Sequence, residues 1–248
     1  MPEGPSMIIL KETLAPFAGK KVLAVTGQAN IDFEKLRNKT LTGFKTWGKH
    51  FLICFPRFTV RIHFMLFGSC LVNERKKAMP GLRLQFNNGE VNFYASAIRI
   101  IEEPLDDIYD WSADVMNEAW DPKKALAKLK REPDMLVCDA LLDQQIFSGV
   151  GNIIKNEVLY RIRVHPASTV GALPLQQRKD LVREAVQYSF DFLRWKKAYE
   201  LKKHWLAHTR KICPRCDIPL VKEYMGKTNR RTFFCNNCQV KYGGKRQT

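Results

Sequence analysis

Residues 139–166 read DALLDQQIFSGVGNIIKNEVLYRIRVHP, and this stretch decides the fold of the second half of the chain. Its apolar positions predict one helix that ends near Phe147 and a second helix that Asn152 is placed to cap. Between them Gly149 and Gly151 allow a tight turn. Such a turn exposes backbone N–H groups at a helix N-terminus, where the helix dipole favours an anion. The stretch predicts a phosphate-binding turn, or alternatively an ordinary helix–loop–helix packed only for stability.

The end of the chain carries four cysteines in the pattern C-x2-C-x18-C-x2-C, namely Cys213, Cys216, Cys235 and Cys238. Two such pairs predict a tetrahedral Zn²⁺ site with four thiolate ligands. Four sulfur ligands leave no open position for water, so the metal is expected to be structural. Between the pairs the sequence predicts a β-hairpin that presents Arg230 and Arg231 near its tip.

The first hundred residues show a different periodicity. A short helical pattern follows Pro5, and residues 22–101 then read as strands joined by short turns. Residues 58–64 alternate apolar and polar side chains, and the Asn-Asn-Gly at residues 87–89 is typical of a tight hairpin. This half is therefore expected to form a β-sandwich or barrel with one flanking helix.

An acidic, irregular stretch at residues 102–110 separates the two patterns. Beyond it Asp121 precedes a proline and is expected to cap a short helix, and a long helix is expected at residues 175–195, with Phe190 on its buried side. The expected architecture is an α+β multi-domain chain. It comprises a β-sandwich domain at 1–110, a linker at 111–121, a helical domain at 122–210 and a zinc-ribbon hairpin at 211–248.

The charge of the chain indicates its partner. The 248 residues carry 41 Lys and Arg against 25 Asp and Glu, a formal net charge of +16, which favours a polyanion. No apolar run reaches membrane-spanning length, and the first residues lack the features of a signal peptide. The expectation is a cytoplasmic, monomeric protein without a membrane partner.

Four segments together resemble a known family: MPEGP at the N-terminus, WGKH at 47–50, LLDQ followed by GVGN within 141–152, and the closing cysteines. They are similar, in the same order, to the formamidopyrimidine-DNA glycosylase and endonuclease VIII family of base-excision repair enzymes. The likeness extends over nearly the whole chain. It implies a helix–two-turn–helix, a zinc hairpin and damaged, double-stranded DNA as the partner.

The N-terminus then gains a chemical interpretation. Once Met1 is removed, the secondary amine of Pro2, with a pKa of roughly 8, can attack a sugar carbon and form an iminium ion. Glu3 is the neighbouring general acid and base. The resemblance implies that Lys49 binds phosphate beside the lesion. One departure is Ser6, which stands where relatives usually carry a glutamate, so proton handling or rate could differ.

The resemblance also implies DNA contacts, and Gly149, Gly151 and Asn152 of the glycine turn are expected to be among them. Arg230 matches an arginine that clamps phosphates around the lesion. Arg231 is either an auxiliary contact or a solvated side chain, and Arg99 is expected to meet a phosphate. The three successive apolar residues Met65, Leu66 and Phe67 match a loop that fills the gap left by an extruded base, although packing in the core is their simpler interpretation.

The expected function is a bifunctional DNA glycosylase and AP lyase that cleaves the strand by β,δ-elimination. Relatives directed at purines typically carry Asp-Pro-Arg-Arg-Phe-Gly where residues 96–101 read SAIRII, so endonuclease VIII and oxidised pyrimidines are favoured. The alternatives are an enzyme directed at 8-oxopurines or formamidopyrimidines, and a non-catalytic zinc protein that binds DNA on the same scaffold.

Overall fold

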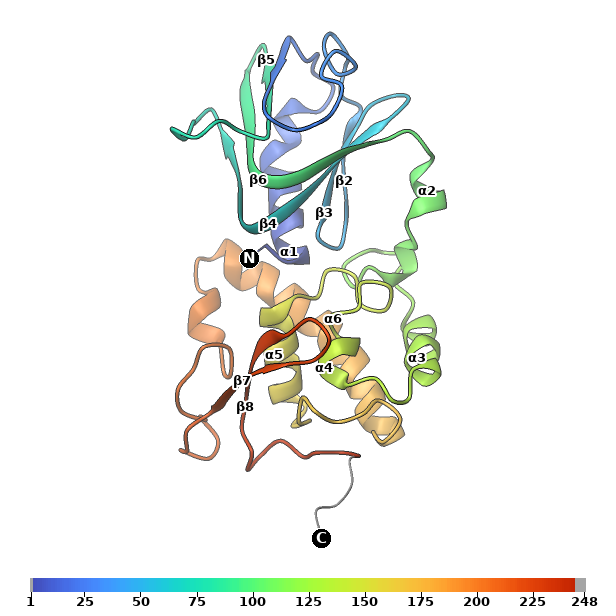
Figure 1. Ribbon diagram of the computed structural model, residues 1–248, viewed down its shortest axis with the longest axis vertical. Helices are drawn as coiled ribbons and strands as arrows, with labels where there is room; N and C mark the ends of the chain where they lie inside the picture. The colour runs from blue at the N-terminus through green and yellow to red at the C-terminus, as the bar shows by residue number, and fades with distance from the viewer. Residues whose placement is uncertain (1, 244–248) are drawn as a thin grey trace. The chain divides into compact units, whose positions relative to one another are not determined.

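The computed structural model describes residues 2–243, which form two compact units, the first ending at Asp110 and the second beginning at Trp111 (Figure 1). Met1 and residues 244–248, the end of the expected zinc ribbon, lie outside the described residues. Within residues 2–243, no helix combines the length and the apolar character needed to cross a lipid bilayer.

The first unit is built on one antiparallel sheet with the strand order β1-β5-β6-β4-β3-β2. The strands are β1 Ala24–Thr26, β2 Gly43–Trp47, β3 His50–Cys54, β4 Thr59–Val72, β5 Leu82–Phe86 and β6 Gly89–Ile101. The turn between β5 and β6 contains the predicted Asn-Asn-Gly, with Phe86 paired to Gly89. The short helix α2, Leu105–Ile108, follows the last strand.

Two long strands convert this sheet into the predicted β-sandwich. β4 and β6 pair along most of their lengths, but their register shifts between Phe64 and Ser69, and the ribbon bends there (Figure 1). Gly68 lies at this bend, where a Cβ atom would come within 2.7 Å of the Ala95 carbonyl oxygen. The predicted sandwich is confirmed, and its two layers are parts of one continuous sheet.

The flanking helix α1, Gly4–Leu14, packs against β2 and β3. A proline in its first turn is favourable there because the first helical N–H groups have no partner within the helix. Met7 and Leu14 are buried in the sandwich core, and Phe17 of the 3₁₀ turn η1, Ala15–Phe17, meets Phe86 with ring centroids 5.0 Å apart.

The second unit contains helices around one apolar core and a two-stranded hairpin. Its elements are η2 Trp111–Ala113, α3 Pro122–Arg131, α4 Val137–Ala140, α5 Asn152–Arg161, α6 Leu175–Lys197, η3 Leu201–His204, β7 Val221–Met225 and β8 Arg230–Phe234. The side chain of Asp121 accepts hydrogen bonds from the backbone of Lys123 and Lys124, which confirms the predicted cap of α3. Residues 111–121 carry η2 and pair with the glycine turn through the bridge between Asp114 and Ser148.

Three local predictions were wrong. The first helix was expected to end near Phe147, but α4 ends at Ala140. Residues 141–147 form turns instead, one of which is closed by the hydrogen bond from the Phe147 N–H to the Asp143 carbonyl oxygen. Gly151, not Asn152, is the N-cap of α5. In α6, Phe190 is exposed and Phe192 is buried instead, because the buried side follows the helical period from Leu181 through Tyr188 to Phe192.

Candidate functional site

The N-terminal end of the first unit places an amine position beside a buried carboxylate. Pro2 is partly exposed, whereas Glu3 is fully buried at 0% exposure and is the N-cap residue of α1. The side chain of Glu3 makes no capping hydrogen bond to the helix. A role as a simple helix cap is therefore excluded for this carboxylate. The Oγ atom of Ser6 is buried and has no hydrogen-bond partner among the described residues.

Lys49 lies in the tight turn between β2 and β3. Gly48 has a φ of 52°, a left-handed conformation that glycine adopts without steric cost. The turn is braced from one side by Trp47, whose Nε1 donates to the Asp110 carbonyl oxygen at 3.0 Å and whose ring lies 5.0 Å from that of Tyr109. The position of Lys49 is thus set by a strand pair and a packed indole.

Polar residues from β3 and β4 surround this turn. His50 pairs with His63 across the strands, and their rings are 5.2 Å apart in an edge-on arrangement. Burial lowers the pKa of His50 to about 3, with further lowering by Arg61, His63 and Lys49. His50 is therefore neutral near pH 7, and its Nδ1 atom lies 3.2 Å from the Tyr109 hydroxyl.

Arg61 and His63 are site residues that sequence reasoning missed. They alternate with the buried residues Val60, Ile62 and Phe64 along β4, so they share the opposite face of the strand. That alternation was visible in the sequence and was used only to predict a strand. Arg61 Nε and His63 Nδ1 are both buried without a hydrogen-bond partner among residues 2–243. Burial, Lys49 and Arg61 lower the pKa of His63, so its ring is neutral near pH 7. The Arg61 Nε–H is an unpaired buried donor that suits an anion such as a phosphate group.

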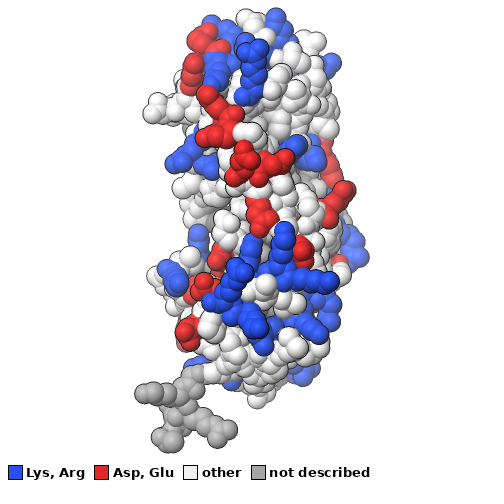
Figure 2. Space-filling view, turned by 90° about the vertical axis from the view of Figure 1, so that its right-hand side faces the viewer, with Lys and Arg blue, Asp and Glu red and all other residues white. Residues whose placement is uncertain are grey.

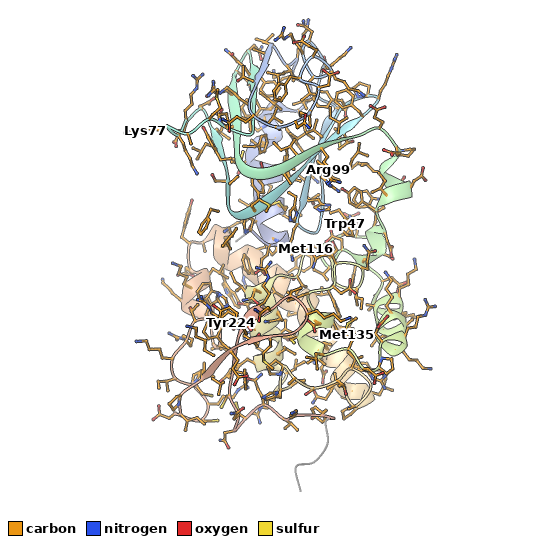
Figure 3. The ribbon with its side chains drawn as sticks, viewed as in Figure 1. Trp47, Lys77, Arg99, Met116, Met135 and Tyr224 are labelled. Carbon is orange, nitrogen blue, oxygen red and sulfur yellow. The ribbon has the colours of Figure 1, made fainter. Side chains whose placement is uncertain are left out.

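Arg99 joins the same face of the sheet. It lies directly opposite Arg61 in the pairing of β6 with β4, and opposed residues of an antiparallel pair point to the same side. Its side chain is exposed, and Figure 3 shows it on β6. The structure therefore brings Arg99 into the neighbourhood of Arg61 within the first unit.

Met65, Leu66 and Phe67 occupy the register shift of β4, where the sequence predicted a turn after the strand. Their exposures are 54%, 56% and 83%, so none of them is part of the core. Packing in the core, the simpler interpretation of these residues, is excluded. These three successive side chains therefore form an exposed apolar patch on the surface of the first unit.

The glycine turn of the second unit differs from the expectation in its hydrogen bonds. Gly149 has a φ of 98°, and its N–H donates to Gln144 Oε1 at 3.1 Å. The Gln144 amide also donates to the carbonyl oxygens of Leu142 and Val150. Gly149 therefore shapes the turn and is not an open phosphate donor, and Gln144 is its internal brace. Gly151 is buried at the N-cap of α5.

The first two turns of α5 bind the hairpin strand β8. Asn152 Nδ2 donates to the Arg231 carbonyl oxygen at 2.8 Å, and Lys155 Nζ donates to Thr232 Oγ1 at 2.7 Å. Asn156 Oδ1 accepts from the Phe233 N–H at 3.3 Å. Lys155 is fully buried, which is rare for a lysine. Hydrogen bonds from these polar side chains therefore join α5 to the hairpin.

The two arginines of the hairpin have different surroundings. Arg230 opens β8 opposite Met225 and is exposed. Arg231 donates to the Tyr224 hydroxyl at 3.2 Å and lies over the ring of that tyrosine, which Figure 3 shows on β7. The hairpin turn is fixed to the 139–166 stretch, because Lys227 N–H donates to Asp139 Oδ1 at 2.9 Å. Arg230 is thus the less constrained of the two guanidinium groups.

The four cysteines form a group that could hold a metal ion. The Sγ atoms of Cys213, Cys216, Cys235 and Cys238 all lie within 4.8 Å of one another. The Sγ atoms of Cys213 and Cys238 are 3.8 Å apart. A tetrahedron with Zn–S bonds of about 2.3 Å has S–S edges of about 3.8 Å, so the donor set fits zinc. The Tyr160 hydroxyl lies 3.1 Å from Cys213 Sγ and ties this group to α5.

Two family models match this chain. The formamidopyrimidine-DNA glycosylase N-terminal domain matches residues 1–99, and the formamidopyrimidine-DNA glycosylase H2TH domain matches residues 111–191. The two matches coincide with the sandwich and with the helical part of the second unit.

Curated relatives and solved structures agree with these matches. Endonuclease 8-like 3 of Mus musculus is 32% identical over 80% of the chain, and Endonuclease 8-like 2 of Mus musculus is 33% identical over 75% of it. The chain spans 34% and 59% of the lengths of these two relatives. A viral DNA glycosylase has the same fold, with a TM-score of 0.82 at 20% identity, covering 96% of this chain and 100% of that one. The Lactococcus lactis formamidopyrimidine-DNA glycosylase bound to DNA with an AP site has a TM-score of 0.84 at 19% identity with the same coverage.

Proposed function

Because this chain belongs to the formamidopyrimidine-DNA glycosylase and endonuclease VIII family, we propose that it is a bifunctional DNA glycosylase and AP lyase of base-excision repair. The observation that carries this proposal is the partly exposed Pro2 beside the fully buried carboxylate of Glu3. An amine nucleophile next to a carboxylate that can move protons is the minimum that Schiff-base chemistry requires.

The proposed reaction starts at Pro2 once Met1 has been removed. The neutral amine nitrogen bonds to C1′ of the damaged nucleotide, the bond from C1′ to the base breaks, and the amine proton leaves with the base. Opening of the sugar ring then breaks the C1′–O4′ bond and leaves an iminium cation on the proline nitrogen. A secondary amine cannot neutralise this cation by losing a proton, so it persists as an electron sink.

Glu3 moves the protons of the following steps. Its acid form protonates O4′ as the ring opens, and its carboxylate form removes a C2′ proton that the iminium has made acidic. The electron pair released at C2′ expels the 3′ phosphate by breaking the C3′–O bond. A second elimination removes the C4′ proton, and the electron pair released there breaks the C5′–O bond and expels the 5′ phosphate. Hydrolysis of the iminium regenerates the Pro2 amine.

Phosphate groups near the lesion are assigned to two sets of donors, one in each unit. In the first unit Lys49 of the turn before β3 and Arg61 of β4 supply positive charge, and burial together with these two cations lowers the pKa of the neighbouring His63. Arg99 lies opposite Arg61 on the same face of the sheet. In the second unit Arg230 supplies an exposed guanidinium, whose planar fork matches a phosphate. The proposed partner is damaged duplex DNA, bound by a single copy of the chain.

The proposed metal is one structural Zn²⁺ ion held by the four cysteines. When bound, it stabilises the hairpin that carries Arg230 and Arg231, because coordination energy is folding energy in so small a module. The bonds from α5 to β8 already hold the backbone of this hairpin at Arg231 and Phe233 and the side chain of Thr232. The metal and these bonds together hold the arginine in place.

Oxidised pyrimidines are the proposed substrates. Residues 96–101 lie within β6 and pair continuously with β4, from Ser96 opposite Phe64 to Ile101 opposite Thr59. A segment held in a strand cannot form an inserting loop, so this chain relies on Met65, Leu66 and Phe67 alone to fill the gap of an extruded base. Phe67, at 83% exposure, is the most prominent of the three.

Borohydride trapping tests the chemistry. A preparation whose N-terminus is verified as Pro2 by mass spectrometry is incubated with duplex DNA that carries either an abasic site or thymine glycol. A covalent adduct with both substrates is expected, because borohydride reduces the iminium to a stable amine. The Glu3→Gln variant should keep an adduct with the abasic site and lose at least a hundredfold in the excision of thymine glycol. Absence of any adduct from the verified preparation would refute the proposed mechanism.

The substrate is tested separately. Excision rates from duplexes that contain thymine glycol or 8-oxoguanine are compared under single-turnover conditions. Faster release of thymine glycol is expected, and faster release of 8-oxoguanine would overturn the pyrimidine assignment without affecting the Schiff-base chemistry. Strong, salt-sensitive binding without cleavage of either duplex would indicate a DNA-binding protein without catalytic activity.

A further inference from the structure

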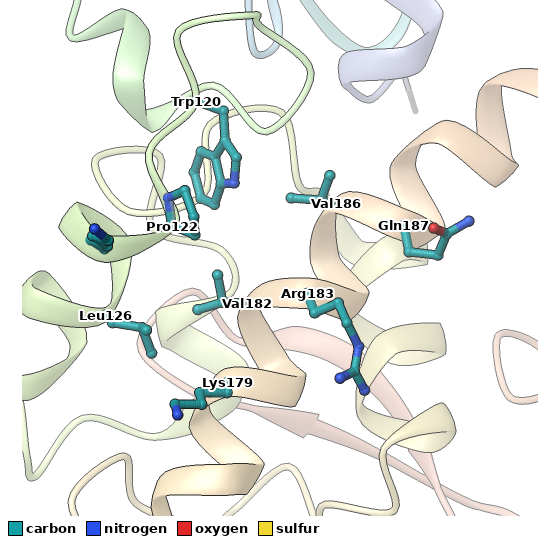
Figure 4. Close-up of a pocket in the computed structure, with 9 residues that line it drawn as sticks. Trp120, Pro122, Leu126, Lys179, Val182, Arg183, Val186 and Gln187 are labelled. Carbon is teal, nitrogen blue, oxygen red and sulfur yellow. The ribbon is translucent and has the colours of Figure 1, made fainter.

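An apolar groove lies between α3 and α6 of the second unit, and none of the residues assigned above lines it. It has a volume of about 490 Å³. Figure 4 shows Trp120, Pro122 and Leu126 on one wall and Val182 and Val186 on the other. Both walls belong to the second unit, so the groove does not depend on the placement of the first unit.

The walls of the groove pack against the core and are incompletely covered. Trp120, Leu126 and Val186 pack against the buried core of the unit, yet each keeps part of its surface exposed. The indole of Trp120 also stacks at a tilt on the fully buried ring of Phe147, with centroids 6.0 Å apart. The groove is therefore preformed, and covering its apolar surface would be favourable by about 25 cal/mol per Å² removed from water.

The rim of the groove is basic. Lys123, Lys179 and Arg183 line it. Among the residues that the structure describes, Lys123 and Lys179 take part in no ion pair, and Arg183 pairs with Asp180 of its own helix. Further cations follow along α3, whose sequence is PKKALAKLKR, and Figure 2 shows Lys and Arg side chains gathered on the face that carries this helix. A ligand of the groove would meet positive charge on its edges.

The combination of an apolar floor with a basic rim selects one class of ligand. A nucleic-acid backbone could neutralise Lys123 and Lys179 but would leave Leu126 and Val186 uncovered by any apolar group. A peptide can satisfy both, because large apolar side chains on one face can enter a groove while carboxylates on its flanks reach the rim. Charge complementarity with the rim requires those flanks to be acidic.

We propose that the groove between α3 and α6 is a docking site for an acidic peptide segment of a partner protein, one that presents apolar side chains on a single face. Apolar side chains of the peptide contact Trp120, Leu126 and Val186, and its carboxylates pair with Lys123 and Lys179. None of the residues that line the groove is among the proposed catalytic or DNA-binding residues. The proposal does not depend on the proposed enzymatic activity.

A displayed library of random 12-residue peptides tests this proposal on the full chain. Peptides are selected on the immobilised native protein, and the dissociation constants of the enriched sequences are then measured by fluorescence anisotropy. The test variant is Lys123→Glu with Lys179→Glu. Its matched control is Lys130→Glu with Lys196→Glu, which changes the same charge with one exposed lysine on α3 and one on α6, outside the groove. All four positions are exposed, so both variants are expected to fold.

Enriched peptides should combine acidic residues with large apolar ones. The test variant should bind them at least about tenfold more weakly than the native protein, and the control should bind within about twofold. The Leu126→Ala variant should also weaken binding, which separates contact with the floor from simple charge attraction. The proposal is overturned if no peptide is enriched, or if both double variants bind the enriched peptides equally well. It is also overturned if the enriched sequences lack acidic residues. The same holds if the test variant, but not the control, binds the peptides normally and instead loses binding to duplex DNA or loses self-association.

Discussion

Replacing Thr232 with valine should loosen the hairpin that carries the arginines. Thr232 is 1% exposed, and its Oγ1 accepts a hydrogen bond from the fully buried Lys155 ammonium at 2.7 Å. Valine has nearly the shape of threonine, so the substitution removes the acceptor without opening a cavity. It removes the hydrogen bond to a buried charge, together with the weaker bond that Oγ1 donates to the Arg230 carbonyl oxygen at 3.0 Å.

The magnitude follows from that charge. A hydrogen bond to a charged group contributes about 1.5–3 kcal/mol, so the free energy of unfolding should fall by about 2 kcal/mol in Thr232→Val. For a chain of this size a loss of 1 kcal/mol lowers Tm by roughly 3 °C, which gives a decrease of about 6 °C. Affinity for lesion-bearing duplex DNA should fall with it, because Arg230 and Arg231 directly precede this residue.

A double-mutant cycle with Lys155→Met identifies the cause. In the Lys155→Met background no buried ammonium remains, so Thr232→Val should lose only the neutral bond to the Arg230 carbonyl oxygen and cost about 1 kcal/mol or less. Urea unfolding followed by tryptophan fluorescence, with constant m values, gives the four free energies. The control is Thr228→Val, an exposed threonine of the same hairpin that should change stability by under about 0.5 kcal/mol. Equal losses from Thr232→Val in both backgrounds would refute the assignment to Lys155.

The remaining predictions concern the other parts of the site. Cys235→Ser should lower the zinc content measured by metal analysis, the Tm measured by calorimetry and the affinity for duplex DNA measured by fluorescence anisotropy. Unchanged zinc content would contradict the four-cysteine site. Phe67→Ala should leave Tm unchanged, since the side chain is 83% exposed. It should slow base excision from duplex DNA more than from single-stranded DNA, and equal slowing on both substrates would exclude the void-filling role. His50 has a folded-state pKa of about 3, below the ordinary 6.5, so its contribution to stability is complete above pH 6.5 and declines as the pH falls toward 3, by at most about 1.4 kcal/mol per pH unit. His50→Gln should flatten the acid limb of a plot of unfolding free energy against pH, and an unchanged slope would contradict the lowered pKa.

Much of the fold was accessible from local sequence because the signals were local. Alternation along residues 58–64 predicted β4, and the glycine turn and the four cysteines predicted the helical unit and the hairpin. These features depend on backbone conformation and on spacing, which a single segment carries by itself. The wrong prediction for Phe190 shows the limit of a local signal. Phe190 and Phe192 are two residues apart and cannot share one helix face, and the local sequence did not indicate which of them would face the core.

The roles of individual polar atoms were decided by tertiary structure. Asn152 was expected to cap α5, yet its amide binds the Arg231 carbonyl oxygen, 79 residues away. Gly149 was expected to offer its N–H to a phosphate, yet Gln144 accepts it. A donor of this kind has several possible partners, and the choice is made by whichever acceptor the packed chain brings within 3 Å.

The sequence by itself determined the order of the elements, the four thiols, the amine and carboxylate at the N-terminus and the excess of positive charge, because each is a property of residue type and spacing. Only the tertiary structure placed Arg61 and His63 beside Lys49, buried Lys155 against Thr232 and opened the groove between α3 and α6. Those arrangements join segments that lie far apart in the chain or depend on how side chains fill the space between elements, and no local pattern encodes such distances.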